Sequence, residues 1–224
     1  MPAENEFLPT FSEVYRQQPL LFIPNQGQAD ANVSFIAQKL GYYVGISAQE
    51  VSMTLFRPHE SSTALHLVWK FVGASGDAIV EGLDQEAGSF HYFIGPRSTC
   101  RFMNLTPYRK VICRELWAGI DVLIQEQDQS LAFEWIIRPN GRPEDIRFTC
   151  EGCHDIHLNE AGDLIIDTGL GVLVDAKPVA YQAKQSEVLP IICRYELQCE
   201  SCGANKVGFV LPEGYDRELD LIIR

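Results

Sequence analysis

Two Cys-x-x-Cys motifs are the residues of this sequence whose types and spacing are best suited to chemistry. The first, CEGCH, begins at Cys150, and the second, CESCG, begins at Cys199. Together they contribute four thiols: Cys150, Cys153, Cys199 and Cys202. Two such pairs can supply the four thiolates of a tetrahedral zinc site, although disulfides are an alternative for the same residues. The spacing therefore predicts a structural zinc ion or disulfides here, and no other cofactor.

The chain has seven cysteines, an odd number, so at least one thiol stays free or links two chains. Disulfides do not persist in a reducing cytoplasm, but they could form if the protein assembled into a fibre or coat and was then released by cell lysis. Cys113 and Cys193 lie in apolar segments that we expect to be strands. We therefore expect both to be buried as small apolar side chains.

Two groupings contain catalytic residue types. Cys153 is close in sequence to His154 and His157, but a cysteine nucleophile needs a histidine within hydrogen-bond distance, and neighbours on a strand point to opposite faces. His154 could instead replace a cysteine as a metal ligand. Asp121 and Glu134 could form the carboxylate pair of a glycosidase, yet strand alternation places Glu134 on a polar, solvated face. We assign no catalytic residue and expect a protein that is not an enzyme.

Aromatic residues could instead build a surface for a sugar or a protein, because flat rings supply contact area with little loss of entropy. The candidates are Tyr42, Tyr43, Trp69, Tyr92, Trp117 and Trp135. Such rings more often fill the core of a sandwich. Trp117, which we place in a turn beside Gly119, is the strongest candidate for an exposed ring.

The elements that position these residues are predicted to be strands. In residues 64–73, one face carries Leu65, Leu67, Trp69 and Phe71, and the other carries His66 and Lys70. The same period recurs in 51–55 and 131–137. Short alternating runs between turn formers are typical of a sandwich or a barrel. We predict an all-β, sandwich-like fold of many short antiparallel strands.

The chain divides into an N-terminal arm and two β lobes. Residues 1–19 form the arm, in which 10–18 could make a helical turn or two before Pro19 stops it. The irregular stretch before Pro107 suggests a boundary between a first lobe, 20–106, and a second lobe, 107–224. One continuous domain is the alternative, since all-β units often exceed 200 residues.

Composition and charge exclude several classes of function. The 224 residues are 46% hydrophobic, enough for a packed core, and the formal net charge is −12. That charge repels phosphate backbones, so nucleic acid is not an expected partner. No apolar run is long enough to insert in a membrane, and no signal peptide is visible as written, so we expect synthesis in the cytoplasm.

A series of short phrases resembles a known family. In order along the chain they are NQGQ (25–28), VSFIA (33–37), GYYV (41–44), HYFIG (91–95), PYRKV (107–111), LWAGIDV (116–122), LAFEWIIRPNGRPEDI (131–146), PVAYQ (178–182) and YDRELDLII (215–223). They resemble the domain of unknown function that precedes SBBP, β-propeller-type, repeats in bacterial exported and surface proteins. The resemblance implies a β-rich, non-catalytic module at a cell surface or in an extracellular assembly.

The resulting expectation is a structural or interaction module of a bacterial surface, spore or envelope assembly that mediates self-assembly or binds a partner protein. A zinc-stabilised monomer that binds a protein or a glycan is the alternative, and a hydrolase of glycan or peptide is the less favoured one. Unlike the relatives, this sequence carries many cysteines, has no export signal as written and ends at Arg224.

Overall fold

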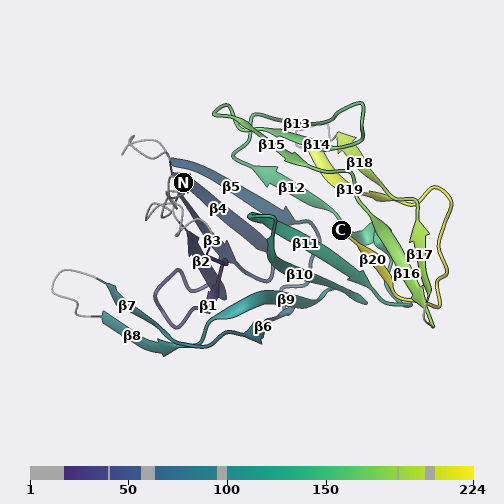
Figure 1. The fold of residues 1–224 in the computed structure, drawn as a ribbon. Helices are drawn as coiled ribbons and strands as arrows, with labels where there is room; N and C mark the ends of the chain where they lie inside the picture. Colours follow the sequence, from purple (N-terminus) through teal and green to yellow (C-terminus); the bar gives the residue numbers. More distant parts are fainter. Residues whose placement is uncertain (1–17, 40, 57–63, 95–99, 186, 200–204) are drawn as a thin grey trace, which may run out of the picture.

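The computed structural model describes residues 18–39, 41–56, 64–94, 100–185, 187–199 and 205–224 (Figure 1). The predicted arm, 1–19, and its helical turn, 10–18, therefore lie almost wholly outside the described residues. Within those ranges the chain forms twenty strands and one short 3-10 helix, with no α-helix. The prediction of an all-β fold is confirmed.

The first five strands follow one another as antiparallel neighbours. They are β1 (Phe22–Pro24), β2 (Phe35–Lys39), β3 (Tyr42–Ile46), β4 (Glu50–Phe56) and β5 (Ala64–Phe71). In β5, Leu67 and Phe71 are buried and Leu65 and Trp69 are half-buried. The alternation predicted for residues 64–73 is confirmed.

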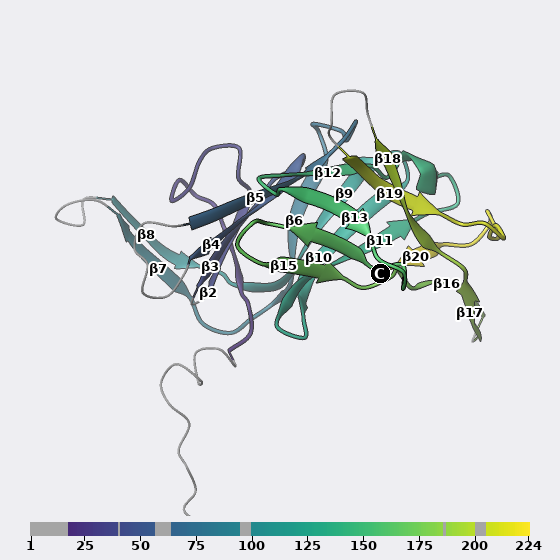
Figure 2. The same cartoon turned by 90° about the horizontal axis from the view of Figure 1, so that it is seen from above.

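The next six strands centre on the long strand β9. They are β6 (Ile79–Gln85), β7 (Phe90–Ile94), β8 (Cys100–Leu105), β9 (Tyr108–Trp117), β10 (Ile120–Gln127) and β11 (Ser130–Ile137). β9 pairs with β6 and with β10, whereas β7 and β8 form a separate hairpin that projects from the body (Figures 1 and 2). Asp128 and Gln129 join β10 to β11 with φ of 50° and 64°. Positive φ at both positions is typical of the tight turn that continues the strand twist.

The C-terminal part begins with the 3-10 helix η1 (Pro143–Asp145) and contains nine strands. They are β12 (Phe148–Glu151), β13 (Asp155–Leu158), β14 (Leu164–Asp167), β15 (Val172–Asp175), β16 (Ala180–Lys184), β17 (Glu187–Ile191), β18 (Arg194–Cys199), β19 (Asn205–Val210) and β20 (Leu221–Ile223). Strands β13, β14 and β15 form a small sheet of their own.

All other strands except β7 and β8 join one large sheet. Its order is β17-β16-β20-β11-β10-β9-β1-β2-β3-β4-β5-β12-β19-β18, and β6 pairs with β9 off this path. The sheet crosses the predicted boundary at Pro107, because β1 and β6 pair with β9, and β5 pairs with β12.

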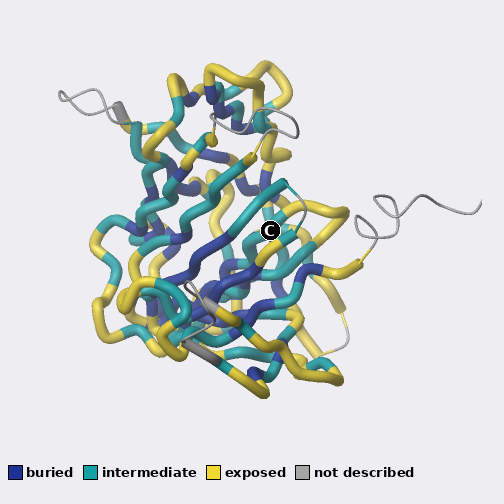
Figure 3. Tube along the Cα trace, turned by 90° about the vertical axis from the view of Figure 1, so that its left-hand side faces the viewer, coloured by how far each residue is buried: buried dark blue, intermediate teal, exposed yellow. Residues whose placement is uncertain are grey.

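The large sheet curls until strands far apart in its order face each other across one core. Trp135 in β11 lies with its ring centroid 5.8 Å from that of Phe71 in β5 and 6.1 Å from those of Phe148 and Phe209. Buried positions run through the centre of the molecule and exposed ones lie at turns and sheet edges (Figure 3). This arrangement is sandwich-like, with aromatic rings between the facing layers.

One edge of the large sheet carries a proline. Pro190 in β17 lies opposite Tyr181 in β16. Val179 and Arg224 exchange two hydrogen bonds, and because such pairs alternate along an antiparallel ladder, the N–H and C=O of Tyr181, two residues later, also point toward β20 and away from Pro190. The nitrogen of Pro190 therefore points outward, where it offers no donor to another strand.

Candidate functional site

Cys113 and Cys193 are both buried, as predicted. Cys113 lies within β9, but Cys193 lies in the link between β17 and β18, so its predicted position within a strand is wrong. Burial raises the pKa of each thiol to about 12. Both side chains therefore stay protonated and act as apolar packing at neutral pH.

The first Cys-x-x-Cys motif forms a tight turn at the end of β12. The thiol of Cys153 donates a hydrogen bond to the carbonyl oxygen of Cys150 at 3.1 Å. Desolvation and the neighbouring Cys153 raise the pKa of Cys150 above its usual range. Gly152, between the two cysteines, has a φ of 85°. It lies so close to β5 that an added Cβ would be 2.0 Å from the carbonyl oxygen of His66.

The second motif is described only in part, because Cys202 and the side chain of Cys199 lie outside the described residues. The backbone nevertheless brings the two motifs to the same end of the sheet. Phe148, Val207 and Leu197 share one rung across β12, β19 and β18. Cys150 follows Phe148 by two residues, and Cys199 follows Leu197 by two residues in the same direction. Within the described ranges no three histidine, cysteine or acidic side chains gather as a metal site.

The cysteine and histidines that were considered as a catalytic grouping, and not assigned as one, are not joined in the structure. In the described residues no hydrogen bond joins Cys153 to His154 or His157; the ring of His154 lies over Gly169, and His157 pairs with Asp155 at 3.0 Å.

The two carboxylates considered for glycoside cleavage each face a different arginine. Asp121 is 1% exposed, bonds Arg138, and accepts the amide of Glu115 at 2.8 Å. Glu134 pairs with Arg224. Both carboxylates are thus held in ion pairs.

The predicted aromatic candidates divide between core and cleft. Trp117 is 7% exposed and donates its indole N–H to the carbonyl of Val72 at 3.2 Å, so the expectation of an exposed ring is wrong. It ends β9 and does not lie in a turn, and Phe71 and Trp135 cover it. Trp69 and Trp135 instead both line a cleft.

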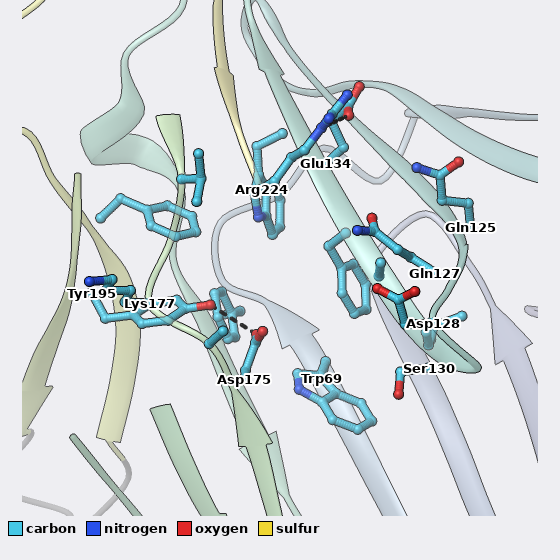
Figure 4. Close-up of a pocket in the computed structure, with 18 of the residues that line it drawn as sticks. Trp69, Gln125, Gln127, Asp128, Ser130, Glu134, Asp175, Lys177, Tyr195 and Arg224 are labelled. Atoms are coloured by element: carbon cyan, nitrogen blue, oxygen red, sulfur yellow. Dashed lines mark hydrogen bonds and ion pairs between the residues drawn. The ribbon is translucent and has the colours of Figure 1, made fainter. Parts of the chain in front are cut away.

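This aromatic cleft has a volume of about 380 Å³ and opens between the β10–β11 hairpin and the segment after β15 (Figure 4). Its apolar lining consists mainly of rings, contributed by Trp69, Phe71, Phe133, Trp135, Phe148, Tyr195 and Phe209. Rings from β5, β11, β12, β18 and β19 meet here because the sheet curls. The cleft therefore could not be read from any one segment of the sequence.

Polar side chains face each other across the aromatic cleft. Gln125, Gln127, Asp128 and Ser130 stand on the side of the hairpin in Figure 4, and none of these side chains has a hydrogen-bond partner among the described residues. Such groups are free to bind a ligand, because they lose no internal bond when they do so.

Asp175 lies on the opposite side of the aromatic cleft and accepts a hydrogen bond from the hydroxyl of Tyr195 at 2.9 Å (Figure 4). Asp175 is exposed as a residue, although its carboxylate is partly desolvated. This desolvation raises the pKa of Asp175 above its usual range, and the bond from Tyr195 opposes the shift. The same burial, reinforced by Asp175, raises the pKa of Tyr195. A partly desolvated carboxylate beside aromatic rings is typical of a binding site.

In the described residues no helix is long and apolar enough to span a membrane. Comparison with known proteins found no match among curated proteins and none among solved structures. One family model, described as "Domain of unknown function (DUF7948)", matches residues 22–223. The match covers every described strand, and both predicted lobes except residues 20, 21 and 224. The chain therefore belongs to the DUF7948 family of domains of unknown function.

Proposed function

We propose that the chain is a non-catalytic interaction module that binds a partner protein in the aromatic cleft, within a bacterial surface, spore or envelope assembly. The cleft itself carries this proposal, because it combines the half-buried rings of Trp69 and Phe133 with polar side chains that have no internal partner in the described residues. Binding sites for proteins and small ligands are built in this way, with apolar area for affinity and a few polar groups for orientation.

Two further observations support the proposal. Asp121 and Glu134, which could have cleaved a glycosidic bond, are held by arginines, and Cys153 is bonded to a backbone carbonyl. The ordered phrases that resemble the domain preceding SBBP repeats support a bacterial surface context. If the partner protein is a second copy of this chain, the same cleft mediates self-assembly.

A random 12-residue peptide library displayed on phage tests the binding role. We expect enrichment on the intact chain, and Trp69→Ala should weaken the selected peptides by about 30-fold, because a truncated ring in a binding centre typically costs about 2 kcal/mol. Fluorescence anisotropy with the labelled peptides measures the loss. Val188→Ala, on the remote strand β17, is the matched control and should bind as the parent does.

If no peptide is enriched, the proposed protein-binding role is wrong. It is also wrong if folded Trp69→Ala binds the selected peptides as tightly as the parent does. If soluble oligosaccharides bind in a Trp69-dependent manner and peptides do not, the ligand is a glycan.

A second candidate role is a zinc-stabilised domain that uses Cys150, Cys153, Cys199 and Cys202. The shared rung of β12, β19 and β18 favours it, because both motifs begin two residues beyond that rung. Four thiolates from two Cys-x-x-Cys motifs suit a structural zinc ion, whose binding then adds to folding stability.

Elemental analysis of protein purified anaerobically and without chelators checks this candidate. We expect about one zinc per chain, and Cys150→Ser should lose it and unfold at a lower temperature, because thiolate ligation is coupled to folding. Cys113→Ser is the control for zinc content, since Cys113 is buried within β9 and belongs to neither motif. Absence of zinc from the parent chain would rule out the four-thiolate site.

A further inference from the structure

The small sheet has a free edge at β15. Within the described residues β15 pairs with β14 and with no other strand. The amide of Thr168 donates to the carbonyl of Gly171 at 3.0 Å, so these two residues form a hydrogen-bonded rung where β14 turns into β15. Because such rungs alternate along an antiparallel pair, Val172 and Val174 point their N–H and C=O groups away from β14.

The free edge is protected only by its short length and by Asp175 at its end. Val172 and Val174 are 58% and 62% exposed, and neither a proline nor a charged residue lies between them. Proteins usually block exposed edges with prolines, charges or bulges, as Pro190 does at β17. An open edge with β-branched residues is well suited to receive another strand.

Two cavities border this edge. The aromatic cleft meets it at Asp175, and a second cavity of about 180 Å³ meets it at the start of β15. The second cavity is lined by Leu55, Phe56 and Leu65 from β4 and β5 and by residues 168 and 170–173 from the β14–β15 turn and β15. Each cavity therefore lies between β5 and one end of β15, so there is an apolar cavity at both ends of β15.

We propose that β15 accepts an extended peptide of a partner protein as the fourth strand of the small sheet. The peptide backbone bonds the outward N–H and C=O groups of Val172 and Val174, and its inward side chains enter the two cavities. This is the strand-addition mode of peptide recognition, in which the main chain supplies affinity and pockets for alternate side chains supply specificity. The inference rests on the proposed partner-binding role and specifies how the partner binds.

The lining of the cavities indicates the chemistry of the peptide. The cavity at Leu55 and Leu65 offers only apolar side chains besides Thr168 and suits an aliphatic residue. The aromatic cleft presents Asp128 and Asp175 near the ring of Trp69, which suits a lysine or arginine that can pair with a carboxylate and lie on the ring. The net charge of −12 also favours a basic partner.

A second copy of the chain fits this edge less well. Two chains of charge −12 repel each other, and only Val172 and Val174 offer outward backbone groups on this four-residue strand. Pairing of two such edges buries too little surface for a stable dimer, which typically needs about 1,200 Å² or more. The occupant is therefore a basic, extended segment of another protein.

Val174→Pro tests the backbone contact directly. Its N–H points away from β14, so proline removes the donor to the peptide and leaves the ladder of the small sheet intact. With labelled peptides selected from the random library as probes, we expect Val174→Pro to weaken binding at least 10-fold. Val174→Thr keeps the N–H and the branched shape, and it should stay within about twofold of the parent.

Amide hydrogen exchange on the intact parent chain gives a second measurement that needs no variant. The amides of Val172 and Val174 should exchange more slowly once a saturating selected peptide is added. If Trp69→Ala abolishes binding but Val174→Pro does not, and these amides stay unprotected, strand addition is wrong while the binding role stands. If no peptide binds, both proposals are wrong. Concentration-dependent dimers that Val174→Pro dissolves would make a second copy the occupant and overturn the proposal.

Discussion

Trp135→Ala is expected to lower the free energy of unfolding by about 3–5 kcal/mol, the usual cost of removing a large buried ring. The ring is 4% exposed and lies within about 6 Å of five other rings, centroid to centroid. Its loss leaves a cavity where the two halves of the curled sheet meet. Urea denaturation followed by circular dichroism measures the change, because strand content is lost on unfolding.

Trp69→Ala serves as the matched control for that truncation. Its ring is half-buried at the wall of the aromatic cleft, so less contact is lost, and the unfolding free energy should fall by less than half as much. Equal losses for both variants would contradict the central position of Trp135 between the facing layers.

Gly152→Ala is expected to destabilise the fold by about 3 kcal/mol or more. Two effects add: a φ of 85° costs an alanine about 1 kcal/mol, and its Cβ would lie 2.0 Å from the carbonyl oxygen of His66. Because the obstacle is backbone and not a flexible side chain, β12 must shift away from β5 to relieve it. The midpoint of thermal unfolding should fall correspondingly, as scanning calorimetry can measure.

Gly171→Ala is the control for Gly152→Ala, since Gly171 has no left-handed φ and an added Cβ meets nothing within 4 Å. It should change the unfolding free energy by less than about 0.5 kcal/mol. If Gly152→Ala behaved like Gly171→Ala, the close approach of the first cysteine motif to β5 would be wrong.

The strands could be predicted from the sequence because alternation is a local property. The face of Leu67 and Phe71 in β5, and that of Trp135 and Ile137 in β11, were both correctly predicted, since one buried row forces period two. Trp117 was misplaced because its burial depends on Phe71 and Trp135, which are distant in sequence. Local turn signals around Gly119 gave no information on that contact.

The aromatic cleft escaped prediction for the same reason. Asp175 and Tyr195 are separated by 20 residues and belong to different sheets, and neither lies in a motif. Their hydrogen bond forms only because the small sheet packs beside the curled one. The pairing of β12, β19 and β18, which aligns Cys150 with Cys199, is likewise a product of topology that motif spacing could not supply.

Pro190 lowers the tendency of this protein to aggregate at high concentration. A sheet of this width would ordinarily invite copies to add at its rim and grow into insoluble fibres. Pro190 has no N–H to donate within the edge strand β17, and this interrupts such growth on that side of the sheet. Replacement of this proline by threonine would therefore create a new site for aggregation without altering the interior.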